Sequence, residues 1–201
     1  GNILAVSLPT WTLFKNSSEI YDLQFTHNQI SQIIPQLDKI KLKEHLESKK
    51  KYQVIARQLT PKMAKKINKL GQPSLNFNKE YLRVYPYHEE ISHIIGYLGK
   101  GNNGLAGVER KYNNILNKGE NLYLTIDSRV QYKVFKTLKN GINLYKYKGA
   151  VGIVLDVTSG EVISAVSFPS YNPNAYSSFQ PTKNQITNSV FAMGSIFKSL
   201  T

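Results

Sequence analysis

A candidate β-hairpin near the C-terminal end constrains the fold more than any other segment. The stretches GAVGIVLDV (149–157) and EVISAVSF (161–168) are rich in β-branched residues and flank the tripeptide TSG (158–160). Apolar runs joined by a short glycine-containing turn are typical of two antiparallel strands. The sequence therefore predicts a buried hairpin. Asp156 is expected to bond the turn residues that follow it rather than to act as an acid catalyst.

Helical patterns precede the hairpin in three places. Residues 28–50 carry isoleucines and leucines at helical spacing with an interruption at Pro35, and residues 60–71 begin with Thr-Pro and end with glycine. The third helix is expected over residues 128–147. Asp127 is its expected N-cap, and Thr60 that of the second helix, because aspartate and threonine commonly cap helices. The apolar positions of the third helix recur every four residues and so share one face; they are Val130, Val134, Leu138 and Ile142.

Further strands complete an α+β fold class. Residues 3–16 are expected to form two short strands broken at Pro9, because proline cannot donate to a strand ladder. The remaining candidates are residues 52–59, 80–87 and 122–127. The glycine-rich residues 99–107 lack the Gly-Lys-Ser/Thr ending of a phosphate-binding loop, so a flexible connection is expected there.

The composition narrows the class of protein. The 201-residue chain has a formal charge of +13, contains no cysteine, and opens with glycine rather than methionine, so we expect that its N-terminus has been cut. It has no apolar run long enough for a transmembrane helix. A basic nucleic-acid binder is one interpretation. However, the lysines are scattered, and arginine, which suits bidentate phosphate contacts, occurs only four times.

The pattern Ser-x-x-Lys occurs twice. Ser48 to Lys51 lies at the lysine-rich end of a predicted helix, where cations are favourable and a solvated face is the simpler interpretation. Ser195 to Lys198 follows Gly194 and the hairpin. If a helix begins near Ser195, Lys198 lies one turn away on the same face. A neutral lysine there can accept the serine proton, and the helix N-terminus favours negative charge on the serine oxygen.

An ordered set of motifs resembles the class B penicillin-binding proteins, closest to their division-associated branch and next to their elongation-associated branch. LTID (124–127) with Gln131, the hairpin, and GSIFK (194–198) resemble the opening of the transpeptidase domain. Upstream, GNILAVS, RQL, YLRVYPY, SHIIGYLG and GLAGVERKYNNIL resemble the N-terminal pedestal. The matching pedestal positions are Arg83, Tyr85, Pro86, His93, Gly96, Gly107 and Glu109.

The resemblance implies a peptidoglycan D,D-transpeptidase. Ser195 would attack a D-alanyl-D-alanine carbonyl to form an acyl-enzyme, Lys198 would take part in the proton transfers, and β-lactams would acylate the same serine. The partners implied are peptidoglycan stem peptides, β-lactams and membrane-anchored wall-synthesis proteins, with no nucleic acid. The parent would be anchored in the bacterial cytoplasmic membrane by an N-terminal helix and would work on its periplasmic side. No cofactor and no metal is expected.

The resemblance also has departures. Ala192 replaces a frequent glutamate, and Ile196 a frequent threonine. Ser-x-Asn occurs only before Ser195, and Lys-Thr/Ser-Gly does not occur. We therefore expect a chain truncated at both ends: a pedestal or dimerisation domain (1–118), then an incomplete transpeptidase domain (119–201) with an antiparallel sheet and helices. The fragment itself is expected to be inactive and poorly soluble, because the hairpin would have open edges.

Three alternatives stay open beside this hypothesis. His93 could be a catalytic imidazole, but a packed or hydrogen-bonded structural histidine is favoured. Glu109 and Arg110 could form a functional pair, but a structural role between domains is favoured. The whole chain could instead be an interaction module of the wall-synthesis machinery, or a β-lactam sensor that stops at the acyl-enzyme.

Overall fold

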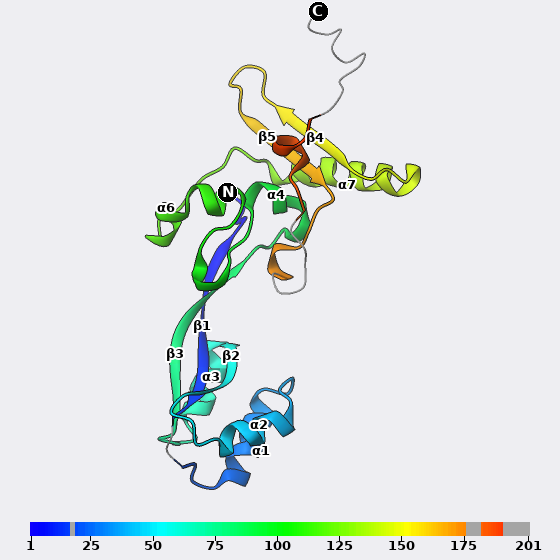
Figure 1. The fold of residues 1–201 in the computed structure, drawn as a ribbon. Coiled ribbons are helices and arrows are strands. Elements are labelled where there is room, and N and C mark those ends of the chain that lie inside the picture. The colour runs from blue at the N-terminus through cyan, green and yellow to red at the C-terminus, as the bar shows by residue number, and fades with distance from the viewer. Residues whose placement is uncertain (17–18, 176–181, 191–201) are drawn as a thin grey trace, which may run out of the picture. The chain divides into compact units, whose positions relative to one another are not determined.

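The computed structural model describes residues 1–16, 19–175 and 182–190, which form two compact units (Figure 1). One unit comprises residues 7–84, and the other combines residues 1–6 with the chain from Tyr85 onward. The observed mixture of helices with antiparallel sheets confirms the α+β class. The domain boundary expected after residue 118 stays a prediction.

The unit of residues 7–84 is a three-stranded sheet with three helices. Strand β1 is central, between β2 and β3. The elements are β1 (Val6–Lys15), α1 (Leu23–Ile33), α2 (Lys39–Glu47), β2 (Gln53–Leu59), α3 (Pro61–Asn68) and β3 (Leu75–Val84). The helices bury one apolar face against the sheet, as their periodicity predicts. The most buried apolar side chains of this core are Leu13, Ile30, Leu42, Leu46 and Ile67.

Short polar side chains set the starts of these helices. The Asp22 carboxylate accepts from the Phe25 N–H, so α1 begins five residues earlier than the sequence predicted. Asp38 caps α2 after the interruption at Pro35, and Thr60 caps α3 with proline at its first position. The first N–H groups of a helix have no partner within the helix, and aspartate or threonine at the N-cap accepts hydrogen bonds from them.

Strand β1 is continuous, which corrects the predicted break at Pro9. Its pairing with β2 runs from Trp11 to Lys15, so Pro9 lies before the first paired residue on that side. Proline disturbs a strand only where its missing N–H is needed by a partner. The strand therefore passes through Pro9 without interruption.

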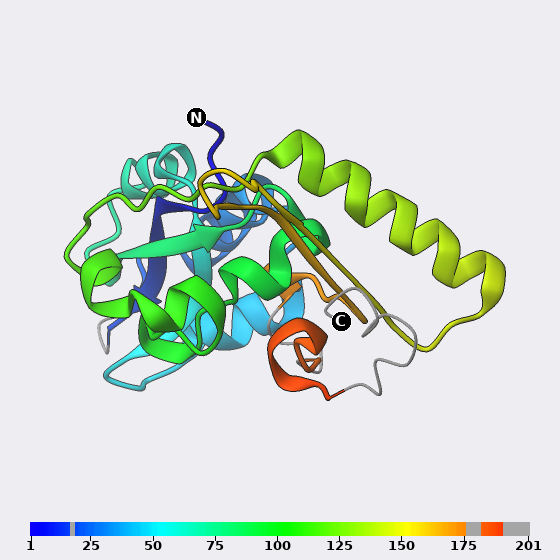
Figure 2. The same ribbon diagram turned by 90° about the horizontal axis from the view of Figure 1, so that it is seen from above.

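The second unit carries the predicted hairpin and its helix, but the hairpin is not buried as expected: Val151, Ile153 and Leu155 of β4 are 40–56% exposed. The elements are η1 (His88–Ile91), α4 (Ser92–Ile95), η2 (Lys100–Asn102), α5 (Gly107–Lys111), α6 (Asn113–Asn117), α7 (Ser128–Tyr145), β4 (Ala150–Leu155), β5 (Val162–Phe168), η3 (Pro173–Ala175) and α8 (Gln185–Asn188). Figures 1 and 2 both show α7 running alongside the β4–β5 hairpin. Val134, Leu138 and Ile142 of α7 pack against Val166 and Phe168 of β5, on the predicted apolar face.

The glycine-rich segment 99–107 is closely packed, which corrects the expected flexible connection. A Cβ on Gly104 would lie 2.0 Å from the Glu109 carbonyl oxygen, and one on Gly107 would lie 2.4 Å from that of Ile94. Leu98 and Gly104 also form a β-bridge. These glycines allow backbones to approach more closely than any side chain would permit, so the segment is a packed turn.

Residues 122–127 do not form the predicted strand. They run past the edge of β5, where the Thr125 hydroxyl donates to the Val162 carbonyl at 2.7 Å and the Asp127 N–H donates to the Ile163 carbonyl at 3.0 Å. One contact uses a side chain and the next a backbone group, so no regular ladder develops. Asp127 then caps α7 as predicted, accepting from the N–H groups of Arg129 and Val130.

Candidate active site

The predicted nucleophile and base lie outside the described residues. Ser195 and Lys198 fall in residues 191–201, so their roles stay predictions. The structure does describe the frame that precedes them: residues 149–175, which begin with the hairpin, and residues 182–190. This frame shows how the chain is held before it reaches the Gly-Ser-x-x-Lys motif.

The hairpin is an antiparallel pair in which Gly152 faces Val166. A Cβ on Gly152 would lie 3.0 Å from a Val134 methyl group and 3.1 Å from a Leu138 methyl group. Because glycine has no side chain, α7 packs close against the two strands at this position. At the other end of β4 the Asp156 carboxylate accepts from the N–H groups of Thr158 and Ser159, at 2.9 and 2.8 Å. This confirms Asp156 as a turn residue, and these bonds lower the pKa of its carboxyl group.

A buried amide ties α7 to β5. The Gln131 side chain is 1% exposed; its oxygen accepts from the Ala165 N–H and its nitrogen donates to the Ala165 carbonyl, both at 3.0 Å. The same amide accepts from the Ser164 hydroxyl at 2.8 Å and donates to the Glu90 carbonyl at 2.6 Å. All four hydrogen-bonding positions of the amide are used. Gln131 therefore supplies hydrogen-bond partners for the backbone of β5 at the edge that faces away from β4.

A second amide anchors the segment after β5. The Asn174 oxygen accepts from the Tyr85 N–H at 2.9 Å, and the Asn174 nitrogen donates to the Tyr85 carbonyl at 2.9 Å. The nitrogen also donates to the His88 ring at 3.1 Å. The Asn172 side chain in turn accepts from the Asn174 N–H at 3.0 Å. Residues 172–174 are thereby fixed to the chain at 85–88.

His93 holds a neighbouring part of the same segment. Its Nε2 lies 2.8 Å from the Pro169 carbonyl oxygen, which also accepts from the Thr182 hydroxyl at 2.6 Å. Because a carbonyl only accepts, Nε2 carries the proton. Burial lowers the pKa of His93, and the bond to Pro169 opposes that shift. His93 is thus a hydrogen-bonded structural histidine, as expected.

Tyr171 packs between these contacts. Its ring meets those of His93 and Tyr97 edge to face, and its hydroxyl donates to the Ser92 carbonyl at 3.0 Å. Burial raises the pKa of this phenol, with a smaller contribution from Tyr97. Further along, the Gln185 N–H donates to the Ser167 hydroxyl at 2.9 Å. The chain is therefore attached at Pro169, Tyr171, Asn174 and Gln185 before it reaches the predicted nucleophile.

The other candidate residues have ordinary structural surroundings. Ser48 is the C-cap of α2, and its hydroxyl accepts from the Lys50 N–H at 3.3 Å, which fits the solvated interpretation of the first Ser-x-x-Lys. Glu109 of α5 is 2% exposed, whereas its neighbour Arg110 is exposed. In the part of the chain that the structure describes, no three acidic, histidine or cysteine side chains are grouped to hold a metal. Over the same residues, no helix is long and apolar enough to cross a bilayer.

Sequence profiles of two protein domains match almost the entire chain. The Penicillin-binding Protein dimerisation domain matches residues 1–140, and the Penicillin binding protein transpeptidase domain matches residues 150–201. The chain belongs to the penicillin-binding proteins. The two domains occur in the order expected for class B of the family. The second match includes both Ser195 and Lys198.

Curated members of the family align along the whole chain. The "Probable peptidoglycan D,D-transpeptidase FtsI" of Caulobacter vibrioides is 31% identical over 208 residues, covering 100% of this chain and 35% of the relative. The "Peptidoglycan D,D-transpeptidase FtsI" of Escherichia coli is 29% identical over 237 residues, covering 100% and 40%. These relatives support the FtsI branch. This chain spans little more than a third of their length.

Solved structures of the family share the fold. Penicillin Binding Protein 2X from Streptococcus thermophilus matches with a TM-score of 0.69 at 15% identity, over 95% of this chain and 35% of that one. A peptidoglycan synthetase from Bifidobacterium adolescentis matches with a TM-score of 0.66 at 20% identity, over 100% and 47%. At this identity the likeness concerns the fold alone.

Proposed function

We propose that this chain is part of a peptidoglycan D,D-transpeptidase of the division-associated branch, with Ser195 as its nucleophile. The observation that carries the proposal is the transpeptidase-domain match over residues 150–201, which includes a Gly-Ser-x-x-Lys motif directly after the anchored segment. The names of the aligned FtsI relatives support the same reaction class.

The reaction would proceed in two acyl transfers. The Ser195 hydroxyl attacks the carbonyl carbon between two D-alanines, a C–O bond forms, and the peptide C–N bond breaks. The hydroxyl proton passes by way of Lys198 to the departing D-alanine amine. An amine of a neighbouring stem peptide then attacks the ester, which forms the cross-link and returns the serine. A β-lactam would form the same ester by opening of its ring.

Labelled-penicillin acylation tests this proposal. In the protein encoded by the complete reading frame, we expect a fluorescent penicillin to label the wild type and not the Ser195→Ala variant. Lys198→Ala should slow labelling by about a hundredfold or more, because general-base assistance is worth about that much. Ser199→Ala is the matched control and should label normally. Labelling that survives Ser195→Ala would refute the assignment.

The 201-residue chain by itself is expected not to be labelled. It contains no Lys-Thr/Ser-Gly, and its Ser-x-Asn patterns precede Ser195. The segments that would complete the oxyanion and substrate contacts are therefore not among its residues. Stable labelling of this chain that Ser195→Ala abolishes would show that these motifs are dispensable for acylation.

The remaining proposals concern partners and location. The substrates would be peptidoglycan stem peptides, with β-lactams as inhibitors and membrane-anchored wall-synthesis proteins as partners. The protein would be anchored by an N-terminal helix and would work on the periplasmic side of the cytoplasmic membrane. Protease treatment of intact spheroplasts tests the location, since a periplasmic domain is cleaved and a cytoplasmic one is protected.

One observation favours an interaction module as a second function. Residues 7–84 form a compact unit with a core of their own, as independent binding modules do. A pull-down with residues 1–118 separates the two functions. Capture of wall-synthesis proteins by this piece alone would show docking that is independent of Ser195.

A further inference from the structure

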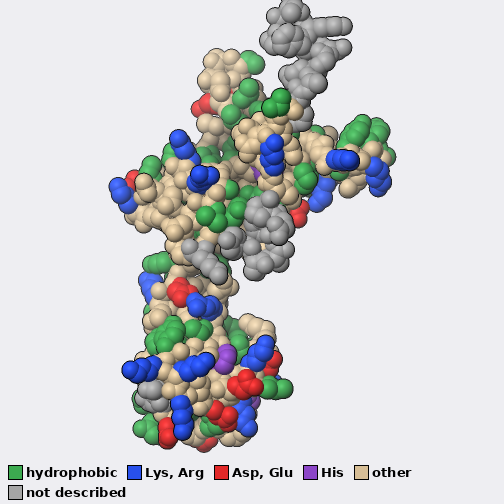
Figure 3. Space-filling view, viewed as in Figure 1, with side chains coloured by type: hydrophobic (Ala, Val, Ile, Leu, Met, Phe, Trp, Pro, Cys, Tyr) green, Lys and Arg blue, Asp and Glu red, His purple; other side chains and the backbone are tan. Residues whose placement is uncertain are grey.

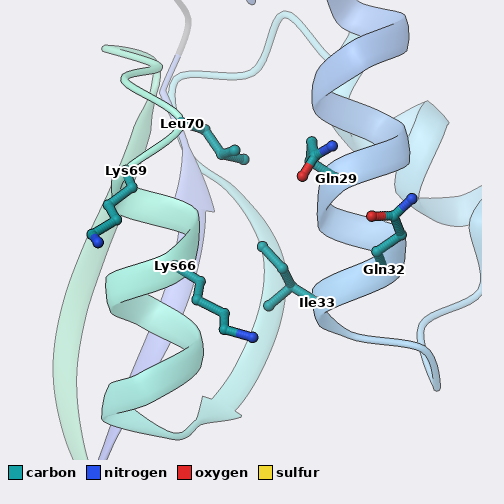
Figure 4. Close-up of a pocket in the computed structure, with 6 residues that line it drawn as sticks. All are labelled: Gln29, Gln32, Ile33, Lys66, Lys69 and Leu70. Atoms are coloured by element: carbon teal, nitrogen blue, oxygen red, sulfur yellow. The ribbon is translucent and has the colours of Figure 1, made fainter.

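A pocket of about 460 Å³ lies between α1 and α3 in the unit of residues 7–84 (Figure 4). Its volume is within the range of sites that take small ligands or the side chains of a bound peptide. The apolar part is Ile33 and Leu70, which also pack against the core of this unit. Because both helices are fixed by that core, the pocket is preformed.

The polar lining of the pocket consists of two amides and two cations. Gln29 and Gln32 lie one turn apart on α1, and Lys66 and Lys69 lie three residues apart at the end of α3. In Figure 4 the Lys66 side chain extends between the helices toward Ile33, whereas the Lys69 ammonium points away from α1. No acidic residue is among the lining residues. The pocket therefore offers hydrogen-bond donors and positive charge above an apolar floor.

Three of these polar side chains, those of Lys66, Gln29 and Gln32, have no bonding partner among the described residues. Two other cations of the unit form ion pairs, Lys43 with Glu47 at 3.9 Å and Arg57 with Glu80 at 3.3 Å, whereas the pocket lining contains no acidic residue with which Lys66 could pair. Figure 3 likewise shows cations beside acidic side chains on the face of this unit turned to the viewer. The pocket is thus a place where positive charge has no acidic neighbour in its lining.

We propose that the α1–α3 pocket binds an acidic peptide segment of a partner protein. A carboxylate of the peptide would pair with the Lys66 ammonium, and the two glutamine amides would bond the peptide backbone beside it. A neighbouring aliphatic side chain would lie on Ile33 and Leu70. A nucleic acid fits less well, because the lining has no arginine and no aromatic side chain for stacking. The inference does not depend on Ser195.

Peptide binding to the 201-residue chain tests the inference. The probe is a fluorophore-labelled acetyl-Glu-Leu-Glu-Glu-Leu-Glu-amide, followed by fluorescence anisotropy. We expect saturable binding with a Kd below about 1 mM, weakened when ionic strength rises from about 0.05 to about 0.5 M. The matched peptide with glutamine in place of every glutamate should bind at least about tenfold more weakly. Equal binding of the two peptides, or no saturable binding, would overturn the proposal.

Paired variants on α3 locate the site. Lys66→Glu should weaken binding by about tenfold or more, whereas Lys65→Glu, an exposed neighbour that does not line the pocket, should change it by less than about threefold. Both variants alter the net charge equally, so a difference between them reports position. Gln32→Ala, an exposed change, should also weaken binding. Equal loss in the two lysine variants, or displacement of the peptide by duplex DNA at equal charge concentration, would refute this pocket as a peptide site.

Discussion

The side chain of Asn174 bonds both backbone polar atoms of Tyr85, 89 residues away in the sequence. It acts as a neighbouring strand would, accepting from the N–H and donating to the carbonyl. Gln131 does the same for Ala165. Two amides thereby hold the frame that leads toward Ser195: one fixes the hairpin to α7, and the other fixes the following segment to residues 85–88.

Replacing Asn174 by aspartate should release the segment after β5. The carboxylate can no longer donate to the Tyr85 carbonyl, and two acceptors then face each other. We expect a loss of about 1–2 kcal/mol in the free energy of unfolding, moderate because Asn174 is exposed. Urea denaturation measures it. Asn188→Asp in α8 is the control, since its side chain is exposed and bonds no described residue, and an equal loss there would contradict the role of the Asn174 amide.

Gln131→Leu should be the more damaging change. Leucine is similar in size but leaves the Ala165 N–H and the Ser164 hydroxyl without their buried acceptor, and two carbonyls without their donor. Each unsatisfied buried group costs about 1–3 kcal/mol, so we expect a loss of at least about 3 kcal/mol. Asn140→Leu, on the exposed side of α7, should change stability by less than about 0.5 kcal/mol.

Two glycines should respond to alanine with opposite signs. Gly104→Ala places a methyl group 2.0 Å from the Glu109 carbonyl, so the packed turn must open, at a cost of about 3 kcal/mol or more. Gly141→Ala in α7 meets nothing within 4 Å and should stabilise by about 0.5–1 kcal/mol through helix propensity. Thermal unfolding of both variants tests the contrast. A tolerated Gly104→Ala would mean that the turn is not tightly packed.

His93 should make stability depend on pH. Because burial lowers its pKa in the folded chain, the unfolded chain binds more protons between that pKa and the ordinary value of about 6.5. Stability is therefore fully present above about pH 6.5 and is lost as the pH falls through this window. Asp127, with a pKa lowered to about 2, titrates well below it. His93→Gln should flatten the profile between about pH 7 and 5.5, and a variant that keeps the wild-type slope would contradict this role of His93.

Local rules were enough to predict much of this fold. Asp127 and Thr60 are predictable as caps because a cap bonds residues two or three positions away, and the Asp156 turn depends on equally local bonds. The hairpin and the apolar face of α7 follow from residue spacing.

The features that residue patterns did not indicate depend on tertiary contacts. An amide gives no periodic signal, so nothing marked Asn174 for a residue 89 positions away, and Gln131 stood out only through the family resemblance. The packing of the glycine turn is likewise not evident from its composition, because it depends on close backbone contacts with Glu109 and Ile94 that no residue pattern marks. The roles of Ser195 and Lys198 stay predictions.

The hairpin turn is a suitable site for attaching a spectroscopic label. Its conformation is closed by Asp156 bonding to the next residues, so it needs nothing from the rest of the molecule. Val157 beside it is 99% exposed, and the chain has no cysteine. A single thiol introduced by Val157→Cys would therefore be the only one in the chain. A spin label or dye attached there would replace only a side chain that is almost fully exposed.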